Sequence, residues 1–212
     1  TGETVDEFSL FDYFDPTSDP ETLNLCGLGF DFVFPNWLYN GVDDQRRDWT
    51  HANAIELDEA NNTLVISVRH LDALLGLRWQ DDAEGSAGEL LWHSGPRGDM
   101  ELVSGDWHLH QHAPELQTDG TVLLYDNGNN RAGFGSDDAP LYSRAVQYEI
   151  DPVANTVEQL WEYRSSRNGT PIFAAFVGDA DRLENGNVLI TNGGINGAAG
   201  DGLSAQIVEV IP

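Results

Sequence analysis

Residues 107–131 read WHLHQHAPELQTDGTVLLYDNGNNR, and the fold prediction starts from this stretch. His108, His110 and His112 follow one another at a spacing of two. In an extended strand that spacing places all three imidazoles on the same face. The whole chain has six histidines, so half of them fall in one short segment. We therefore expect functional chemistry here.

The second half of the stretch predicts a turn, a buried strand and a loop. TDG at 118–120 supplies a turn in which glycine can adopt a positive φ. VLLY at 122–125 is typical of a short buried strand. The polar run DNGNNR at 126–131 is unsuited to regular structure, so we expect a loop that holds Arg131 near the end of a sheet.

The same order of elements occurs in two other places. HANAIELDEANNTLVIS at 51–67 and GDADRLENGNVLITNGG at 178–194 share with residues 112–128 an opening segment, a polar turn and an apolar strand. These apolar strands begin 58 and 66 residues apart, at Leu64, Val122 and Val188. Such a period indicates a fold built from a repeated group of strands.

Further strands are predicted between these units. WHSG at 92–95 and QLWEYR at 159–164 are typical of outer strands. The clean alternation at 143–150, followed by an amphipathic segment at 156–164, predicts a β-hairpin. Residues 71–79 are expected to form one helical turn or a loop. Each period then contains about four short strands, which is the composition of a propeller blade.

We therefore predict an all-β fold of the β-propeller type, with a β-sandwich as the alternative. About three and a half periods fit into the chain, whereas closed propellers have roughly four to eight blades. Residues 1–212 are predicted to form a single partial propeller domain of about three to four blades. Its repeat units lie near 48–70, 108–131 and 178–194. We expect further blades, or other copies in a homo-oligomer, to cover the open strand edges.

Composition excludes several classes of partner. The formal net charge is −26, and all ten cationic side chains are arginine. Such a surface repels nucleic acid and anionic membranes. Cys26 is the only cysteine, which excludes an internal disulfide and a thiolate zinc cluster. No apolar run approaches the roughly 20 residues of a membrane span, and the start at Thr1 without Met predicts a processed or longer protein.

Histidine and arginine side chains are the candidate site residues. His51 and His112 occupy the same position in their repeat units, and equivalent positions of successive blades point toward one central channel. Asn53 lies two residues after His51 and shares its face in a strand. Arg131 and Arg144 add positive charge, which in so acidic a protein is a local attraction for an anion.

A metal site is a second interpretation of the histidine-rich segment. His108, His110 and His112 would together supply three imidazole ligands for zinc and support metal-dependent hydrolysis. No nearby carboxylate or cysteine completes that set in the sequence. We therefore predict a site without metal.

Several motifs, in this order along the chain, resemble the bacterial arylsulfotransferase family. They are DWTHAN at 48–53, SVRH at 67–70, QHA at 111–113, DNGNNR at 126–131, SRAVQYEID at 143–151 and QLWEYR at 159–164. The resemblance covers most of the chain from Asp48 to Gly194. Several motifs in one order are far more specific than any one of them.

The resemblance implies a six-bladed β-propeller that transfers a sulfuryl group from an aryl sulfate to a phenol. Transfer would proceed through a sulfated histidine, without a nucleotide sulfate donor or another cofactor, in the periplasm or outside the cell. By position, the catalytic residues would be His51, His112 and Arg131. The residues expected to bind substrate are Asn53, His70 and Arg144.

The alternative is a propeller that binds ligands or builds an assembly without catalysis. The family's nucleophilic histidine lies in a later blade than the QHA motif, and this sequence has no histidine after His112. The nearest match to that part of the pattern is TNGGING at 191–197, where Asn196 stands instead.

Overall fold

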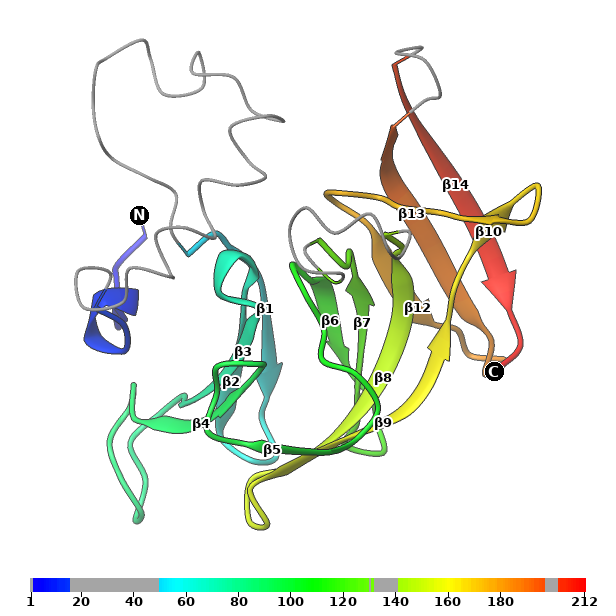
Figure 1. Ribbon diagram of the computed structural model, residues 1–212. Helices are drawn as coiled ribbons and strands as arrows, with labels where there is room; N and C mark the ends of the chain where they lie inside the picture. The colour runs from blue at the N-terminus through cyan, green and yellow to red at the C-terminus, as the bar shows by residue number, and fades with distance from the viewer. Residues whose placement is uncertain (1, 16–49, 130, 132–140, 197–201) are drawn as a thin grey trace, which may run out of the picture.

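Short strands joined by polar turns make up the described part of the chain. The computed structural model describes residues 2–15, 50–129, 131, 141–196 and 202–212 (Figure 1). Within these ranges the only helices are single 3-10 turns, η1 at Leu10–Asp12 and η3 at Arg69–Leu71. The predicted all-β class is confirmed. The described residues contain no helix with the length and hydropathy needed to cross a membrane.

The first sheet is antiparallel and follows the chain in the order β1-β2-β3-β4. Its strands are β1 Ala52–Asp58, β2 Thr63–Val68, β3 Ala73–Arg78 and β4 Leu90–Ser94. The predicted strands at β2 and β4 are confirmed. The helical turn or loop expected at 71–79 is wrong over most of its length, because β3 occupies it. Since all six residues of β3 are buried, this strand shows no alternation of polar and apolar residues.

The second sheet has the order β5-β9-β8-β7-β6. Its strands are β5 Glu101–Ser104, β6 His112–Leu116, β7 Val122–Asp126, β8 Arg144–Asp151 and β9 Thr156–Tyr163. β5 is parallel to β9, and the other pairs are antiparallel. The predicted hairpin corresponds to β8 and β9. The predicted strand that would contain His108, His110 and His112 is wrong in part, because β6 begins only at His112.

The third sheet has the order β12-β13-β14. Its strands are β12 Asp179–Arg182, β13 Val188–Asn196 and β14 Leu203–Val210. Asn185 and Gly186 form the predicted turn between β12 and β13, and Gly186 has a φ of 86°. A short ladder, β10 Ser166–Arg167 with β11 Thr170–Pro171, precedes this sheet.

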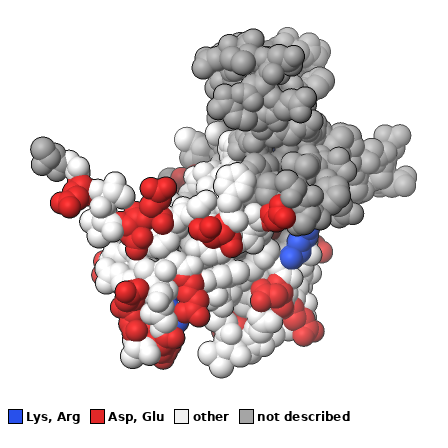
Figure 2. Space-filling view, turned by 90° about the vertical axis from the view of Figure 1, so that its left-hand side faces the viewer, with Lys and Arg blue, Asp and Glu red and all other residues white. Residues whose placement is uncertain are grey.

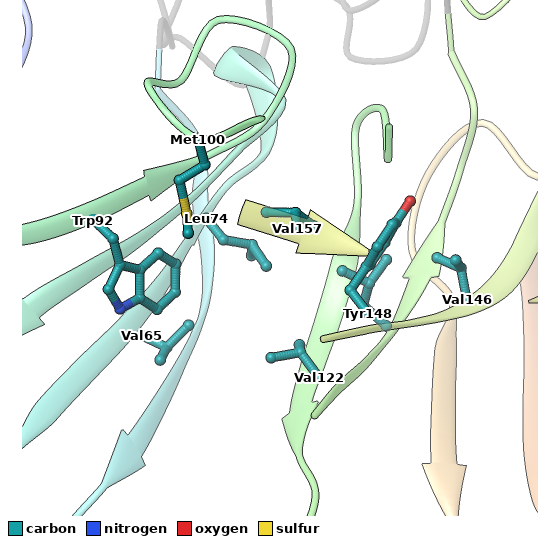
Figure 3. Packing of buried hydrophobic residues seen from close by; sticks show 9 residues of the cluster. Val65, Leu74, Trp92, Met100, Val122, Val146, Tyr148 and Val157 are labelled. Atoms are coloured by element: carbon teal, nitrogen blue, oxygen red, sulfur yellow. The ribbon is translucent and has the colours of Figure 1, made fainter. Parts of the chain in front are cut away.

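The first and second sheets share a hydrophobic core (Figure 3). Val65, Leu74 and Trp92 of the first sheet pack in one cluster with Val122 and Tyr148 of the second. Fully burying an apolar side chain of this size stabilises a fold by about 1.5–3 kcal/mol. This cluster therefore fixes the two sheets face to face.

The opposite face of the second sheet packs on the third. Leu123 and Tyr125 alternate along β7 with residues of the first cluster, and they meet Ala180, Val188 and Ile190 of the third sheet. Both faces of β7 are therefore buried, which explains its continuous apolar sequence. On the far side of the first sheet, a third cluster is closed by side chains of the N-terminal segment, Leu10, Tyr13 and Phe14.

The strands that begin the three repeat units, β1, β6 and β12, lie next to one another. β1 packs against β6, and β12 packs against β6 and β7. β2, β7 and β13 each pair with the strand that begins their unit. The segments that lead into β1, β6 and β12 consequently meet at one end of the sheets, and that end contains the candidate site.

Candidate functional site

His112 opens β6 and is partly buried. Its Nδ1 lies 2.6 Å from Oδ1 of Asn127. Burial lowers the pKa of His112 to about 4; the hydrogen bonds to Asn127 and the His110 backbone oppose this shift, whereas the positive charges of Arg69 and His51 reinforce it. Its imidazole is therefore neutral at pH 7 and can act as a base or nucleophile.

His51 leads into β1 at the position equivalent to His112. Its ring stacks on His70, with centroids 4.8 Å apart, and His70 lies 5.9 Å from His110. His110 in turn places Nδ1 2.8 Å from Oδ1 of Asp72. His51 also acts electrostatically on His112. His70, which the resemblance implied as a substrate-binding residue, is only 1% exposed and stacks on the His51 ring.

Arg69, part of the SVRH motif, is a site residue that the sequence did not single out. The structure buries it at 2% exposure and directs Nη2 to the backbone carbonyl of Ala175 at 2.8 Å. Its backbone N–H donates to the carbonyl of His51 at 3.1 Å. Because its charge acts on His112, Arg69 supplies a cation at the site.

Asn127 is the second residue that sequence reasoning missed, because it falls in a run interpreted as a solvated loop. Its side chain is fully buried. Its Nδ2 donates to the carbonyls of Ala174 at 2.7 Å and Val177 at 2.8 Å. Ser143 Oγ donates to the Asn127 carbonyl at 2.7 Å. The residue that touches His112 is therefore held at both its backbone and its side chain.

Arg131 lies beside this group. Its guanidinium pairs with Asp126, which directly precedes Asn127, and lies 4.5 Å above the ring of Tyr142. Its Nε is buried and has no acceptor. The Nε–H of Arg131 therefore remains without an acceptor, close to Asn127, the residue that binds His112.

Asn53 connects the first sheet to the histidine segment. Its Nδ2 donates to the carbonyl of Gln111 at 2.8 Å, while its Oδ1 is buried without a donor. The amide therefore positions the residue that precedes His112. Asp48, Trp49, Asn130 and the side chain of Asn196 belong to the motifs used above but lie outside the described residues.

Arg144 does not have the geometry expected of a substrate-binding residue. It is 1% exposed. Its Nε donates to Asp126 at 2.7 Å, and Nη1 and Nη2 meet five further acceptors: Gln159, Glu162, Tyr148 and the carbonyls of Asp106 and Trp107. All of its N–H groups are consumed inside the protein, so we correct its role to that of a buried structural charge.

The three alternating histidines do not share one face, as a regular strand would require. His108 Nδ1 faces Gln111 at 2.9 Å, whereas His110 faces Asp72 and His112 faces Asn127. Positive φ at His110 separates their directions. Among the described residues, no three histidine, cysteine or acidic side chains are arranged to hold a metal ion. The geometry does not support the zinc interpretation.

Backbone strain is concentrated at the same place. Eight non-glycine residues of the described ranges have a positive φ, and five of them belong to the site: His51, Asp72, His110, Ala113 and Val177. Val177 is β-branched, and its φ of 52° is a genuine outlier. Such conformations cost roughly 1–3 kcal/mol each and cluster at functional sites.

The charge distribution favours an anion at this site. Figure 2 shows a face with many Asp and Glu side chains and little Lys or Arg. Arg69, by contrast, is almost fully buried. A buried guanidinium is screened little by salt and attracts a negative group strongly at short range.

The fold and the site define a class of protein: an all-β protein with a neutral imidazole, a second imidazole and a guanidinium gathered where its sheets meet. The chain belongs to the arylsulfotransferase (ASST) family, whose model matches residues 1–212.

Two curated relatives are both arylsulfate sulfotransferases AssT. The protein from Escherichia coli O6:H1 is 28% identical over 160 residues, which are 64% of this chain and 27% of the relative. The protein from Lelliottia amnigena is 29% identical over 141 residues, which are 57% of this chain and 24% of the relative. The matched part thus spans about a quarter of each relative's length.

Protonation of His112 is expected to make stability depend on pH. Its folded-state pKa of about 4 lies below the value of about 6.5 in an unfolded chain. Between these values the unfolded state binds more protons, so the free energy of unfolding falls as pH drops through this window, by up to about 3 kcal/mol. Urea unfolding across the window should show the decline.

A His112→Gln variant serves as the reference for this measurement. Carboxylates titrate alike in both proteins, so the difference between the two stability curves isolates His112. We expect the variant to have the shallower curve below about pH 6.5. Parallel curves would contradict the lowered pKa.

Proposed function

We propose that the chain is part of an enzyme that transfers a sulfuryl group from an aryl sulfate to a phenolic acceptor. The observation that carries the proposal is the imidazole of His112, held 2.6 Å from Asn127 at the start of β6, on which the charge of the buried Arg69 acts. Family membership supports the same chemistry, and the curated relatives are arylsulfate sulfotransferases by name.

We also propose that the three sheets are successive blades of a partial β-propeller. They pack face to face, they repeat the same strand order, and the strands that begin the three repeat units are neighbours. In this arrangement residues 1–212 form one partial domain of a six-bladed ring. The equivalent strand starts then face a common axis, which is where propellers bind ligands.

The transfer is proposed to occur in two steps. In the first, a nitrogen lone pair of His112 forms a bond to sulfur, and the bond between sulfur and the aryl oxygen breaks. The aryl oxide leaves with that electron pair and takes a proton from His51. In the second, a phenolic acceptor gives its proton to His51, attacks sulfur and restores the imidazole. The bonds, electron pairs and protons of these two steps balance without a redox or nucleotide cofactor.

Cationic donors lower the barrier of both steps. The sulfuryl group carries charge on three oxygens, much as a phosphoryl group does in a loose transition state. Arg69 supplies a buried positive charge, and Arg131 supplies the unused Nε donor. Preorganised donors of this kind are among the largest contributions to catalysis.

We propose small phenols and aryl sulfates as the partners, and the periplasm or the extracellular space as the location. A small aryl sulfate is attracted by a local cationic site, whereas the acidic surface disfavours nucleic acid.

The proposal is tested with p-nitrophenyl sulfate as donor and phenol as acceptor, without any nucleotide sulfate. We expect phenol-dependent release of p-nitrophenol and formation of phenyl sulfate. Donor alone should leave a sulfuryl group on the peptide that contains His112, detected by mass spectrometry. If folded protein gives neither product nor sulfated peptide, the catalytic proposal fails.

The second candidate is a propeller that binds aryl sulfates without turning them over. It is favoured by the TNGGING segment at 191–197, in which Asn196 stands where the resemblance implies a histidine. Saturable binding of p-nitrophenyl sulfate, without release of p-nitrophenol and without sulfated histidine, would support it.

Replacing Arg69 with glutamine is expected to lower kcat/KM for p-nitrophenyl sulfate by about 10²-fold, the effect of removing one donor from a charged transition state. The variant loses the buried positive charge beside His112. Initial rates of p-nitrophenol release, with thermal unfolding as a folding check, measure the effect.

Arg182→Gln is the matched control for Arg69→Gln. Arg182 ends β12 and donates to Gln147 at 2.7 Å, near the polar turns rather than the strand starts. We expect this variant to retain wild-type kinetics. An Arg69→Gln protein that is folded and as active as the wild type would show that Arg69 takes no part in transfer.

A further inference from the structure

The side chain of Asn127 can be oriented in only one way. Its two flanking acceptors, the carbonyls of Ala174 and Val177, lie 2.7 and 2.8 Å from one end of the amide. A carbonyl can only accept, so that end must be the NH2 group. The other end, Oδ1, is then the atom 2.6 Å from Nδ1 of His112. Oδ1 can only accept as well.

We propose that Asn127 is a positioning residue that fixes the tautomer of His112. The hydrogen bond to Oδ1 requires a proton on Nδ1, because an amide oxygen has none to give. A neutral imidazole has only one proton, so Nε2 keeps its lone pair. Nε2 is therefore the atom of His112 that attacks sulfur or takes a proton.

The third sheet contributes to this arrangement. Ala174 and Val177 lie in the segment that leads to β12, whereas Asn127 directly follows β7 of the second sheet. Ser143 ties the two segments together, since its Oγ donates to the Asn127 carbonyl and accepts from the Ala174 N–H at 2.8 Å. Val177, whose φ is 52°, provides one of the two carbonyls that accept from the Asn127 amide. The proton position on His112 thus depends on correct packing between two sheets.

The same arrangement occurs a second time in the chain and provides a matched control. Gln111 Nε2 donates to Ser67 at 3.1 Å and to the Ala73 carbonyl at 2.8 Å, so its Oε1 accepts from Nδ1 of His108 at 2.9 Å. Both Gln111 and His108 are fully buried. Changing the Gln111 side chain therefore disturbs a buried amide–imidazole pair that includes neither Asn127 nor His112.

The test is 15N NMR of histidine-labelled protein at neutral pH, with His112 assigned by its loss in His112→Gln. In the wild type we expect the protonated, pyrrole-type nitrogen at Nδ1 and the bare, pyridine-type nitrogen at Nε2. Asn127→Ala should populate the Nε2-protonated tautomer. Gln111→Ala should alter the His108 signals and leave those of His112 unchanged.

Asn127→Asp gives a second, independent result. Its carboxylate still accepts from Nδ1 but adds a negative charge, which favours the imidazolium. We expect the tautomer to be kept, the pKa of His112 to rise, and the acid limb of the rate profile to move to higher pH. Asn127→Ala should lower kcat by about 10–100-fold with little change in KM, as loss of an orienting neighbour does at other sites.

The kinetic part of this inference rests on the proposed function, and the NMR part does not. Protein that shows the expected tautomers but no transfer would overturn the proposed function alone. A protonated Nε2 in the wild type, or His112 signals that Asn127→Ala leaves unchanged, would overturn the role of Asn127.

Discussion

Replacing His112 with glutamine is expected to lower the rate of sulfuryl transfer by about 10²–10⁴-fold, the range for a positioned acid–base group. Glutamine keeps a side chain of similar length but has no basic nitrogen. His112 is the imidazole that the structure holds neutral at pH 7, with a pKa of about 4. The rate constants kcat and kcat/KM with p-nitrophenyl sulfate and phenol measure the loss. The sulfated peptide should disappear with them.

His93→Gln is the control for this variant. His93 lies on β4, the outer strand of the first sheet, and packs edge-on against Phe14 with centroids 5.6 Å apart. The same chemical change at this position should leave kcat unaltered. If His112→Gln transferred sulfate as fast as His93→Gln, another residue would have to carry the sulfuryl group, and the role of His112 would be wrong.

The repeats were predictable because each contains a polar turn followed by an apolar strand in the interior of a sheet. The strand starts expected at Leu64, Val122 and Val188 coincide within one residue with β2, β7 and β13. All three strands lie between other strands, and β2 and β7 are also packed on both faces. Their apolar runs and flanking turns are therefore strong local signals.

β3 was not predictable, because its sequence ALLGLR has neither alternation nor a helical pattern. Its strand character depends on contacts made elsewhere in the chain. Gly76 shows this: a Cβ there would lie 2.1 Å from the ring of Trp92 on β4. The glycine is needed because an indole packs directly on its backbone, a constraint visible only when the two strands are paired.

The repeat positions singled out His51 and His112, but nothing in the sequence indicated the contacts of Arg69 and Asn127. The partners of these two side chains are backbone carbonyls, which any residue type can provide. Arg69 reaches Ala175 across 106 residues, and Asn127 reaches Ala174 across 47. A polar side chain that binds distant backbone leaves no motif in the sequence.

For Arg144 the sequence revealed the charge of the side chain but not its location in the fold. An arginine in an acidic protein suggested a substrate anion. The structure instead surrounds it with carboxylates and carbonyls, because β7, β8 and β9 bring Asp126 and Glu162 to it. A buried, fully paired arginine has a structural role, whereas an accessible one can bind a ligand. The local sequence around Arg144 does not reveal whether its side chain is buried.

Replacing Arg144 with methionine is expected to lower the free energy of unfolding by about 3–5 kcal/mol, the cost of breaking a buried ion pair by removing one partner. Methionine fills part of the volume but cannot donate hydrogen bonds. Asp126, which is fully buried, would keep Arg131 but lose the donor at 2.7 Å. Urea unfolding monitored by tryptophan fluorescence measures the loss.

A double variant separates the charge effect from simple loss of packing. If the buried carboxylate causes the destabilisation, Arg144→Met with Asp126→Asn should be less destabilised than the sum of the single variants, with a coupling free energy of about 1–3 kcal/mol. Arg164→Met removes a guanidinium whose side chain is 43% exposed and paired with Glu162; exposed pairs contribute about 0–1 kcal/mol. If the free-energy changes of the two single substitutions simply add in the double variant, Arg144 stabilises the sheet by its packing contacts alone. The charge of Asp126 is then compensated by Arg131.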